Sequence, residues 1–487
     1  MARTPPPRAL MPLLLSSLLA GCGASLPAQG RYVPPVSEAE ELRLAAEADA
    51  GIRREMGLLN DAALQRVVSQ AGARLAAASG RPDLPWHFTV LDVAAANAFA
   101  LPGGYVYLTR GLLPYLNDEA ELAAVIGHEM GHVASGHAAR LLAPGGGTVP
   151  PVDTPGILCP VVQHFRSRAA ALPDLRALFA RFGPEDELQA CLFTVTCLAR
   201  AGWDPRGVES SRSTLERLDV STDGRGVPTW VETHGSSADF ADDIRTAIDQ
   251  AVATVSVRQR QRDGDGYVER LHDLVFGDDL RDGLVRGNEF LQPALGVAFM
   301  VPAGWEVTND RTRMVAVQPG QTAFLLLDPV PAARRRQVAE VAGIVMQRAG
   351  FQLVSGGATT IGGLDSFVGT YQGTVDGLGD ALVRAAWFRR SGRVLQLTGL
   401  AASGRFEAVR TLFESSIRSF RSLEAGEAGR FTPQRLDTYT VRSGDTWESI
   451  ARRNGGVVMP IALALINHAE LTDPPQPGTA IKVVVAR

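Results

Sequence analysis

The sequence is short of lysine and cysteine and has no apolar run of the about 20 residues that span a bilayer as a helix. Lysine occurs only at position 482, which we attribute to codon bias rather than to chemistry. Lys and Arg (48) nearly balance Asp and Glu (52), and no dense basic stripe is present, which excludes electrostatic binding to nucleic acid. With 45% hydrophobic residues, the 487-residue chain is neither disordered nor a membrane bundle. Its length indicates about three folded domains.

The first residues have the pattern of an export signal. Two arginines lie in the first eight residues, and the mostly apolar stretch 9–20 ends in Leu19-Ala20-Gly21-Cys22, which resembles a bacterial lipobox. The alternative is an ordinary signal with a chance cysteine. The resemblance implies cleavage before Cys22, a lipid on its thiol and, with Gly23 next, sorting to the outer membrane. We therefore predict a signal peptide at 1–21, a tether at 22–36 and a lipoprotein of the periplasm anchored to the outer membrane.

Three cysteines remain after Cys22, namely Cys159, Cys191 and Cys197. An odd number in an oxidising compartment leaves at least one free or intermolecular thiol. Cys191 and Cys197 are six residues apart on one predicted helix, so they cannot pair with each other. Cys159 can reach either, and the sequence does not decide between them.

The pattern along the chain indicates a multidomain α+β protein. Helical patterns cover 38–56, 61–78, 119–141 and a stretch after 184, and continue to about residue 261. Two short β stretches flank the Pro-Gly-Gly turn at 102–104, after a strand-like run at 87–93. From 287 to 423 the pattern is strand-rich with two amphipathic helices, at 332–349 and 406–420. We expect domains at 37–262, 285–423 and 436–487.

The strongest chemical signal is His128-Glu129-Met130-Gly131-His132. On a helix, residues i and i+4 share a face, so both imidazoles can bind one metal ion, with Glu129 beside them as a general base. The motif follows the apolar run 123–127, and an ionisable trio in a buried helix is costly unless it is used. The pattern predicts one zinc ion per chain.

A catalytic zinc has three protein ligands. His137 follows His128 by nine residues, which on a continuous helix directs it to the opposite face, and the metzincin spacing fails because Ala138 stands where its third histidine belongs. A carboxylate from the next long helix is the better candidate, and Glu185-Asp186-Glu187 opens that helix. The residues alone leave the three acids open.

The chain resembles one zinc-peptidase family, which includes the CAAX prenyl protease and bacterial periplasmic proteases that act in outer-membrane protein assembly. The resemblance covers about 37–261 and rests on Asn97-Ala98-Phe99-Ala100-Leu101-Pro102-Gly103-Gly104, on Thr109-Arg110-Gly111-Leu112-Leu113, on Glu121-Leu122-Ala123 and on the histidine motif. It implies a mainly helical zincin-like domain with a small edge sheet. The family's third ligand precedes an A-G-[YW]-D-P segment, here residues 201–205, which places it at Glu187.

Two positions depart from the family pattern. The acid that orients a metal ligand one turn after the third ligand is Cys191 here, and Gly183-Pro184 replaces the usual Ser-Arg. A thiol at position 191 either bonds weakly to a ligand or binds zinc itself. The family also has a later histidine that steadies the developing oxyanion, and Thr233-His234 resembles that segment. The alternative for His234 is a loop histidine bonded to backbone.

The resemblance implies hydrolysis of a peptide bond. Zinc activates water and polarises the scissile carbonyl, and Glu129 takes the proton and passes it to the leaving amine. An extended substrate can pair with the edge strand formed by Asn97, Ala98, Phe99, Ala100 and Leu101. The Gly- and Pro-rich loop 143–160 acts either as a lid or as a passive insertion.

The two downstream regions have no cluster of catalytic residues. Residues 285–423 loosely resemble an α/β sandwich found beside such peptidases, and either bind a partner or act as a spacer. Residues 439–451 (Tyr-Thr-Val-Arg-Ser-Gly-Asp-Thr-Trp-Glu-Ser-Ile-Ala), Leu465-Ile466-Asn467 and Pro477-Gly478 resemble a LysM module, a βααβ unit that binds peptidoglycan, although Trp447 stands where Leu is commoner. Sugar binding and a structural cap both remain open.

Two functions follow from these patterns. The first is a lipid-anchored periplasmic zinc endopeptidase that acts on envelope proteins, in outer-membrane protein assembly or quality control. The second is a scaffold or chaperone-like binding protein with a weakened peptidase site, associated with peptidoglycan. The intact His128, Glu129, His132 and Glu187 favour the enzyme.

Overall fold

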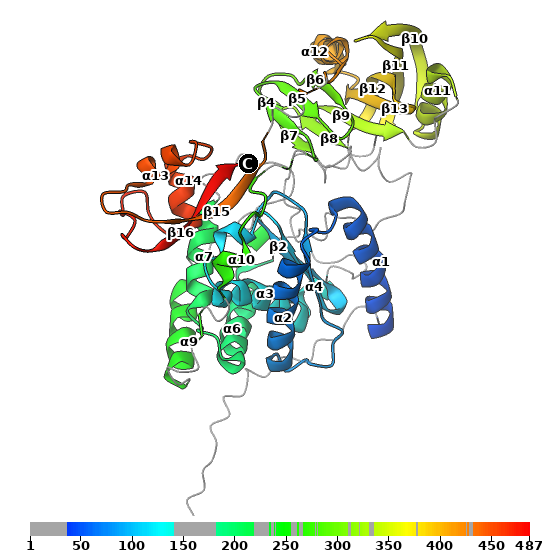
Figure 1. The fold of residues 1–487 in the computed structure, drawn as a ribbon. Coiled ribbons are helices and arrows are strands. Elements are labelled where there is room, and N and C mark those ends of the chain that lie inside the picture. The colour runs from blue at the N-terminus through cyan, green and yellow to red at the C-terminus, as the bar shows by residue number, and fades with distance from the viewer. Residues whose placement is uncertain are drawn as a thin grey trace, which may run out of the picture. The chain divides into compact units, whose positions relative to one another are not determined.

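The computed structural model describes residues 37–140, 182–218, 233–234, 238, 240–254, 261–262, 266–277, 279, 281–309, 313–320, 322–330, 336–375, 378–424, 426–427 and 432–487. The predicted signal peptide, the tether with Cys22, the loop 143–160 and Cys159 lie outside these residues. The described chain mixes helices with several sheets, so the predicted mixed class is confirmed (Figure 1).

A small sheet and two helices begin the described chain. Helices α1 (Glu38–Met56) and α2 (Ala62–Ala78) precede a three-stranded sheet of order β1–β3–β2. β1 (His87–Leu91) runs parallel to β3 (Tyr105–Thr109), and β2 (Ala98–Leu101) pairs with β3 in the antiparallel sense. The turn η1 (Pro102–Gly104) needs its glycines, because Gly103 and Gly104 have φ of 78° and 94°. In the order β1–β3–β2, strand β2 is one of the two edge strands of this sheet.

Helix α3 (Glu119–Ala134) carries the histidine motif and is buried along nearly all its length. Asp118 caps its start, accepting a hydrogen bond from the Glu121 amide at 2.9 Å. The prediction of one helix over 119–141 is wrong in its last part. The chain leaves α3 at Gly136, whose φ is 73°, and begins the short helix α4 (His137–Arg140) in a new direction.

Four helices follow in the described chain: α6 (Pro184–Ala201), α7 (Gly207–Leu218), α9 (Ala241–Thr254) and α10 (Tyr267–Arg270). α6 begins with Pro184 at its first turn and ends at Gly202, whose φ of 84° is left-handed. Pro205 follows within three residues, so the sequence specifies both ends of the helix.

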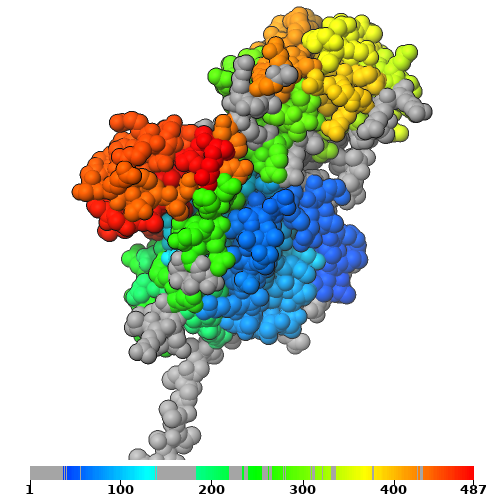
Figure 2. All heavy atoms as spheres, viewed as in Figure 1, coloured from blue at the N-terminus to red at the C-terminus, as the bar shows by residue number. Residues whose placement is uncertain are grey.

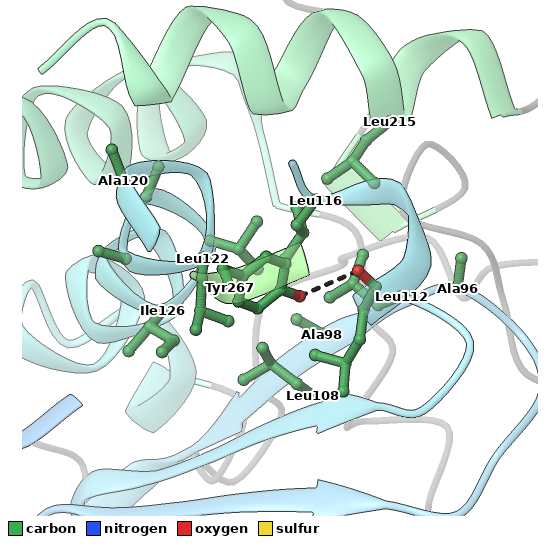
Figure 3. Close-up of a cluster of buried hydrophobic side chains, with 14 of the residues drawn as sticks. Ala96, Ala98, Leu108, Leu112, Leu116, Ala120, Leu122, Ile126, Leu215 and Tyr267 are labelled. Atoms are coloured by element: carbon green, nitrogen blue, oxygen red, sulfur yellow. Dashed lines mark hydrogen bonds between the residues drawn. The ribbon is translucent and has the colours of Figure 1, made fainter. Parts of the chain in front are cut away.

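The core around α3 is apolar and includes the fully buried side chain of Tyr267. Figure 3 shows Tyr267 lying among side chains of α3, the sheet and α7, with its hydroxyl donating to the Leu113 carbonyl at 2.9 Å. Because this bond satisfies the only polar atom of the side chain, Tyr267 is fully buried at little cost. α3 is buried along nearly its whole length, and blue atoms of the first helices cover part of the face of this region in Figure 2. The motif helix is therefore held rigidly on several sides.

Residues 284–422 form two sheets with two helices. A seven-stranded sheet has the order β10–β11–β12–β13–β9–β8–β7, and a four-stranded sheet has the order β14–β6–β5–β4. The strands are β4 (Leu284–Arg286), β5 (Glu289–Gln292), β6 (Val297–Met300), β7 (Glu306–Asn309), β8 (Met314–Val317), β9 (Ala323–Val330), β10 (Gln352–Ile361), β11 (Leu364–Val375), β12 (Gly379–Arg390), β13 (Arg393–Ala402) and β14 (Arg421–Ser422). The helices are α11 (Val338–Arg348) and α12 (Phe406–Arg418).

The two faces of the larger sheet belong to different cores. On β12, Ala385 and Trp387 join the cluster that contains α11, whereas Ala386 and Phe388 join the cluster that contains α12 and the smaller sheet. Successive strand residues point to opposite faces, so this alternation gives a layered sandwich.

The last residues fold in the order β15 (Gln434–Thr440), α13 (Trp447–Arg453), α14 (Pro460–Ile466) and β16 (Ala480–Ala486). β15 and β16 pair in the antiparallel sense. Thr446 caps α13 and exchanges hydrogen bonds with Ser449 in a capping box. Asn467 holds β16 by donating to the Lys482 carbonyl and accepting from the Lys482 amide, both at 2.8 Å.

The single lysine of the chain has a structural role, which codon bias does not explain. Lys482 is buried, and its ammonium group donates to the carbonyls of Pro114 at 2.6 Å and Leu116 at 2.9 Å, just before α3 begins. Burial lowers the pKa of Lys482 to about 7, although the Glu121 and Asp118 carboxylates act in the opposite direction.

This burial predicts a pH-dependent stability. Between pH 7 and 10.5 the unfolded chain holds a proton on Lys482 that the folded chain lacks, so the free energy of unfolding rises with pH. We expect Lys482→Met to remove this component, leaving a slope shallower by up to about 1.4 kcal/mol per pH unit. Chemical unfolding of both proteins from pH 7 to 10 measures the difference. Parallel slopes would show that Lys482 does not lose its proton in this range.

Candidate metal centre

Helix α3 presents His128 and His132 on one face, as the i, i+4 spacing predicts. Their Nε2 atoms lie 3.1 Å apart, and both rings are buried. Burial lowers the pKa of His128 well below its usual value, and neighbouring imidazoles add to this effect. The imidazole is therefore neutral, as a metal ligand must be.

Helix α6 brings Glu187 to the same point. Its Oε2 lies 3.2 Å from His128 Nε2, and its Oε1 lies 3.5 Å from His132 Nε2. Of the other two acids that open α6, Glu185 is exposed and Asp186 lies beside His137 instead. The structure therefore brings together the two histidines and the acid that the family register selects.

Two glycines of the motif helix permit this approach. A Cβ added to Gly131 would lie 2.9 Å from Ala190 Cα on α6, and one added to Gly127 would lie 2.9 Å from the Thr194 methyl group. Any side chain at these positions would push α6 away from α3. Gly127 and Gly131 thus set the distance between Glu187 and the histidines.

The burial of the Glu187 carboxylate is only partly compensated by its charged neighbour Arg212 among the described residues. Neither of its oxygens accepts a hydrogen bond with acceptable geometry among the described residues, and the side chain is 1% exposed. Burial raises the pKa of Glu187 to about 7, against the influence of His234 and Arg212. A bound cation would compensate for this burial.

Glu129 and His234 face the same space. Glu129 is buried, and its Oε1 lies 3.1 Å from His234 Nε2. Thr233 Oγ1 lies 2.7 Å from His234 Nδ1 and 3.4 Å from Asn97 Oδ1, which ties His234 to the start of the edge strand. Burial lowers the pKa of His234, but the Glu187 and Glu129 carboxylates outweigh it and raise the pKa overall.

These residues fit a divalent metal ion. Ligand atoms of His128, His132, Glu187 and His234 all lie within 4.8 Å of one another, and all four residues are buried. Imidazole nitrogen and carboxylate oxygen are the donors that catalytic zinc sites use. The Glu187 and Glu129 carboxylates are both buried beside these rings, and a bound cation would compensate for that burial. The donor set can hold zinc.

Cys191 lies behind His128. Its Sγ is 3.6 Å from His128 Nδ1, and burial raises the pKa of the thiol to about 12, so it is neutral. Cys197 is also a buried free thiol, which agrees with the prediction that these two cysteines do not pair. A neutral sulfur accepts hydrogen bonds only weakly, so Cys191 orients His128 less firmly than a carboxylate would.

Sequence reasoning missed Arg212 of α7. This side chain is 5% exposed, and its Nη1 lies 3.6 Å from Cys191 Sγ and 3.9 Å from Glu187 Oε2. The Arg212 guanidinium is therefore close enough to form an ion pair with a carboxylate, if one replaced the thiol at position 191. The spacing of residues in the sequence could not reveal Arg212, because it lies on a separate helix. α7 packs against α3 through Gly207, and this tertiary contact has no local sequence pattern.

This arrangement predicts that Cys191→Asp strengthens the site. The new carboxylate would accept from His128 Nδ1 and pair with Arg212, and outer partners of this kind are worth about 10–100-fold in metal affinity. We expect zinc affinity to rise by about 10-fold or more. Competition with a chromophoric chelator measures it, and Cys197→Ser on the same helix is the control. Unchanged or weaker binding by a folded variant would contradict the prediction.

His137 does not lie where a continuous helix would place it. The prediction that it points to the opposite face is wrong, because the turn at Gly136 brings the ring back to α3. His137 Nδ1 lies 3.0 Å from His132 Nδ1. It therefore contacts a candidate metal ligand, His132, without belonging to the candidate donor set.

The predicted substrate strand is terminal in its sheet. β2 lies at the edge beyond β3, and the side chains of Asn97, Ala98, Phe99 and Leu101 are buried while Ala100 is partly exposed. The Asn97 carbonyl accepts from the Thr109 amide at 2.9 Å.

Within the described residues, no helix is long and apolar enough to cross a bilayer.

Comparison with known proteins gives two matches along the chain. Residues 62–245 match peptidase family M48, and residues 439–484 match the LysM domain. The first range contains the histidine motif, Glu187 and His234, and the second contains α13, α14, the end of β15 and most of β16. M48 peptidases are zinc-dependent, in agreement with the donor set.

Curated relatives share the first region. The beta-barrel assembly-enhancing protease of Escherichia coli K12 is 26% identical over 294 residues, covering 56% of this chain and 59% of that protein. The mitochondrial metalloendopeptidase OMA1 of Arabidopsis thaliana is 30% identical over 189 residues, covering 38% of this chain and 36% of that protein. The metalloprotease YcaL of E. coli K12 is 28% identical over 165 residues, covering 34% of this chain and 63% of that protein.

The chain spans less than two thirds of the length of each of these relatives. Their names and the family match support a metalloendopeptidase. Residues 62–245 are thus similar to peptidase family M48, and residues 439–484 are similar to the LysM domain.

Proposed function

We propose that this chain is a zinc-dependent endopeptidase of the bacterial envelope that hydrolyses peptide bonds of envelope proteins. The observation that carries the proposal is the convergence of His128 and His132 from α3 with Glu187 from α6, beside Glu129. These residues would hold one zinc ion, which supplies Lewis acidity toward water and the scissile carbonyl.

The side chains around this point have separate roles in the proposal. Glu129, buried and 3.1 Å from His234, accepts the proton of the attacking water and passes it to the leaving amine. His234 donates a hydrogen bond to the oxyanion that develops on the scissile carbonyl. Its link to Asn97 through Thr233 holds it next to the strand proposed for substrate.

Substrate would bind as an extended strand along β2. The strand is terminal in its sheet, and the residue just before it, Asn97, is linked to His234 through Thr233. A polypeptide added along this edge uses backbone hydrogen bonds, which accept many sequences. The proposal therefore favours unfolded or extended segments of proteins over small peptides that are too short to pair with the strand.

The envelope location rests on the sequence and on a relative. The lipobox-like segment ending at Cys22 supports cleavage and lipidation, and the E. coli relative is named a beta-barrel assembly-enhancing protease. We infer a periplasmic lipoprotein of the outer membrane that acts in the assembly or quality control of outer-membrane proteins. Residues 285–423 would present substrate or bind a partner, or act as a spacer.

The LysM domain supports binding to peptidoglycan. The Trp447 indole at the start of α13 donates to the Asp473 carbonyl at 2.7 Å, which connects α13 to the loop between α14 and β16. The Asp445 carboxylate accepts from the Tyr439 hydroxyl and from the Arg442 amide. A structural cap is the alternative. Pull-down on insoluble peptidoglycan, with and without residues 436–487, separates them. Equal retention would exclude sugar binding by this domain.

Cleavage of casein by the purified chain tests the proposed activity. We expect one zinc per chain, loss of cleavage with a chelator and recovery when zinc is returned. Cleavage that a chelator does not affect would refute the metallopeptidase.

The second candidate is an envelope scaffold with a weakened peptidase site. Cys191 favours it, since a neutral thiol stands 3.6 Å from His128 Nδ1 in place of a carboxylate. This candidate predicts peptide or partner binding without cleavage, even when zinc is bound. The same casein assay therefore discriminates between the two.

A further inference from the structure

A chain of hydrogen-bonding groups leads away from the proposed metal centre through His137. His132 Nδ1 lies 3.0 Å from His137 Nδ1, and His137 Nε2 lies 3.0 Å from Gln189 Oε1 and 3.3 Å from Asp186 Oδ1. His137 is 2% exposed and its contact with His132 is buried, whereas Asp186 is partly exposed and Gln189 is exposed. Sequence analysis assigned no role to His137.

The proton positions in this chain follow from its two ends. A metal ion on His132 Nε2 requires that Nδ1 carries the proton of that ring. His132 Nδ1 then donates, so His137 Nδ1 must accept. The proton of His137 is consequently on Nε2, where the oxygens of Gln189 and Asp186 accept it. With His132 Nε2 directed to the metal, each of these groups has a consistent role as donor or acceptor.

We propose that His137 is a positioning residue that fixes the tautomer and the ring orientation of His132 for zinc binding. The proposal rests on the zinc site of the proposed function. In this proposal His137 touches neither substrate nor the reacting atoms and acts through its contact with His132. Its partners Asp186 and Gln189 lie on α6, one residue before and two residues after Glu187, so it also links the turn after α3 to the helix that supplies Glu187.

The turn between α3 and α4 places His137 beside His132. α3 ends at Ala134, and Gly136 adopts a left-handed φ of 73°, which turns the chain so that His137 begins α4. The Phe182 ring stacks on the His132 ring, and the two ring centres are 4.2 Å apart. His132 is thus confined by packing on one side and by a hydrogen bond on the other.

Two substitutions separate the hydrogen bond from the packing. His137→Phe keeps a ring of similar size and removes the acceptor, whereas His137→Asn keeps an oxygen close to the position of Nδ1. We expect His137→Phe to bind zinc about 10–100-fold more weakly than wild type in competition with a chromophoric chelator. We expect His137→Asn to recover most of the affinity. Thermal unfolding of the metal-free proteins reports whether the variants remain folded.

Each result supports or overturns the proposal. A folded His137→Phe protein with wild-type zinc affinity overturns it, and so does an Asn variant as weak as the Phe variant. Should His137→Phe not fold, ¹⁵N-histidine NMR of the zinc-loaded wild-type chain decides, because the proposal requires a protonated Nε2 and a bare Nδ1 on His137. The opposite tautomer overturns it. A wild-type chain that binds no zinc contradicts the proposed function itself, and this reference measurement keeps the two failures apart.

Discussion

Replacing Glu129 by Gln is expected to abolish peptide cleavage while zinc remains bound. The glutamine keeps the size of the side chain but cannot accept the proton of the attacking water, and general-base catalysis contributes about 10²–10⁴-fold. Glu129 is not among the residues whose ligand atoms converge on one point, so the donor set stays complete. Casein cleavage and zinc content, measured on the same preparation, test both halves of the expectation.

A matched control for this variant lies on the same helix. Glu119 stands in the first turn of α3, away from the histidine motif, so Glu119→Gln should leave cleavage unchanged. Wild-type cleavage by Glu129→Gln would show that the mechanism is wrong. Loss of zinc from Glu129→Gln would instead assign Glu129 to the metal.

Replacing Glu187 by Gln is expected to remove zinc. The neutral amide is a poor ligand, so we predict that affinity falls by more than the about 10–100-fold typical of a lost outer partner, and that cleavage is lost with the metal. The metal-free variant should be at least as stable as the metal-free wild type, because the amide avoids burying a carboxylate that accepts no hydrogen bond among the described residues. Chelator competition and thermal unfolding measure the two effects.

Glu185→Gln provides the control for that variant. Glu185 lies two residues before Glu187 in the first turn of α6 and is exposed, so the same change of charge there should leave zinc binding intact. Equal zinc affinity of Glu187→Gln and wild type would exclude Glu187 as a ligand.

The elements that position the site follow largely from local signals. The 3.6-residue pattern predicts α1 and α2, and Pro184 and Gly202 mark the ends of α6. The motif spacing predicts that His128 and His132 share a face, and the family register set by residues 201–205 selected Glu187 among three acids. Here short-range sequence pattern and tertiary structure agree.

The features that the sequence did not predict depend on contacts between distant segments. A single left-handed residue, Gly136, redirects His137, and no periodicity distinguishes this turn from a continued helix. Arg212 reaches Cys191 only because α7 packs on α3. Lys482 contacts carbonyls 368 and 366 positions earlier in the chain, partners that no local pattern can name.

Zinc X-ray absorption spectroscopy on the wild-type chain, paired with the spectrum of Glu187→Gln, tests the central claim most directly. The account predicts zinc bound by two imidazole nitrogens and a carboxylate oxygen at about 2.0–2.2 Å, with the oxygen contribution reduced in the variant. A zinc environment with sulfur at about 2.3 Å, with a single imidazole, or unchanged by Glu187→Gln would contradict it.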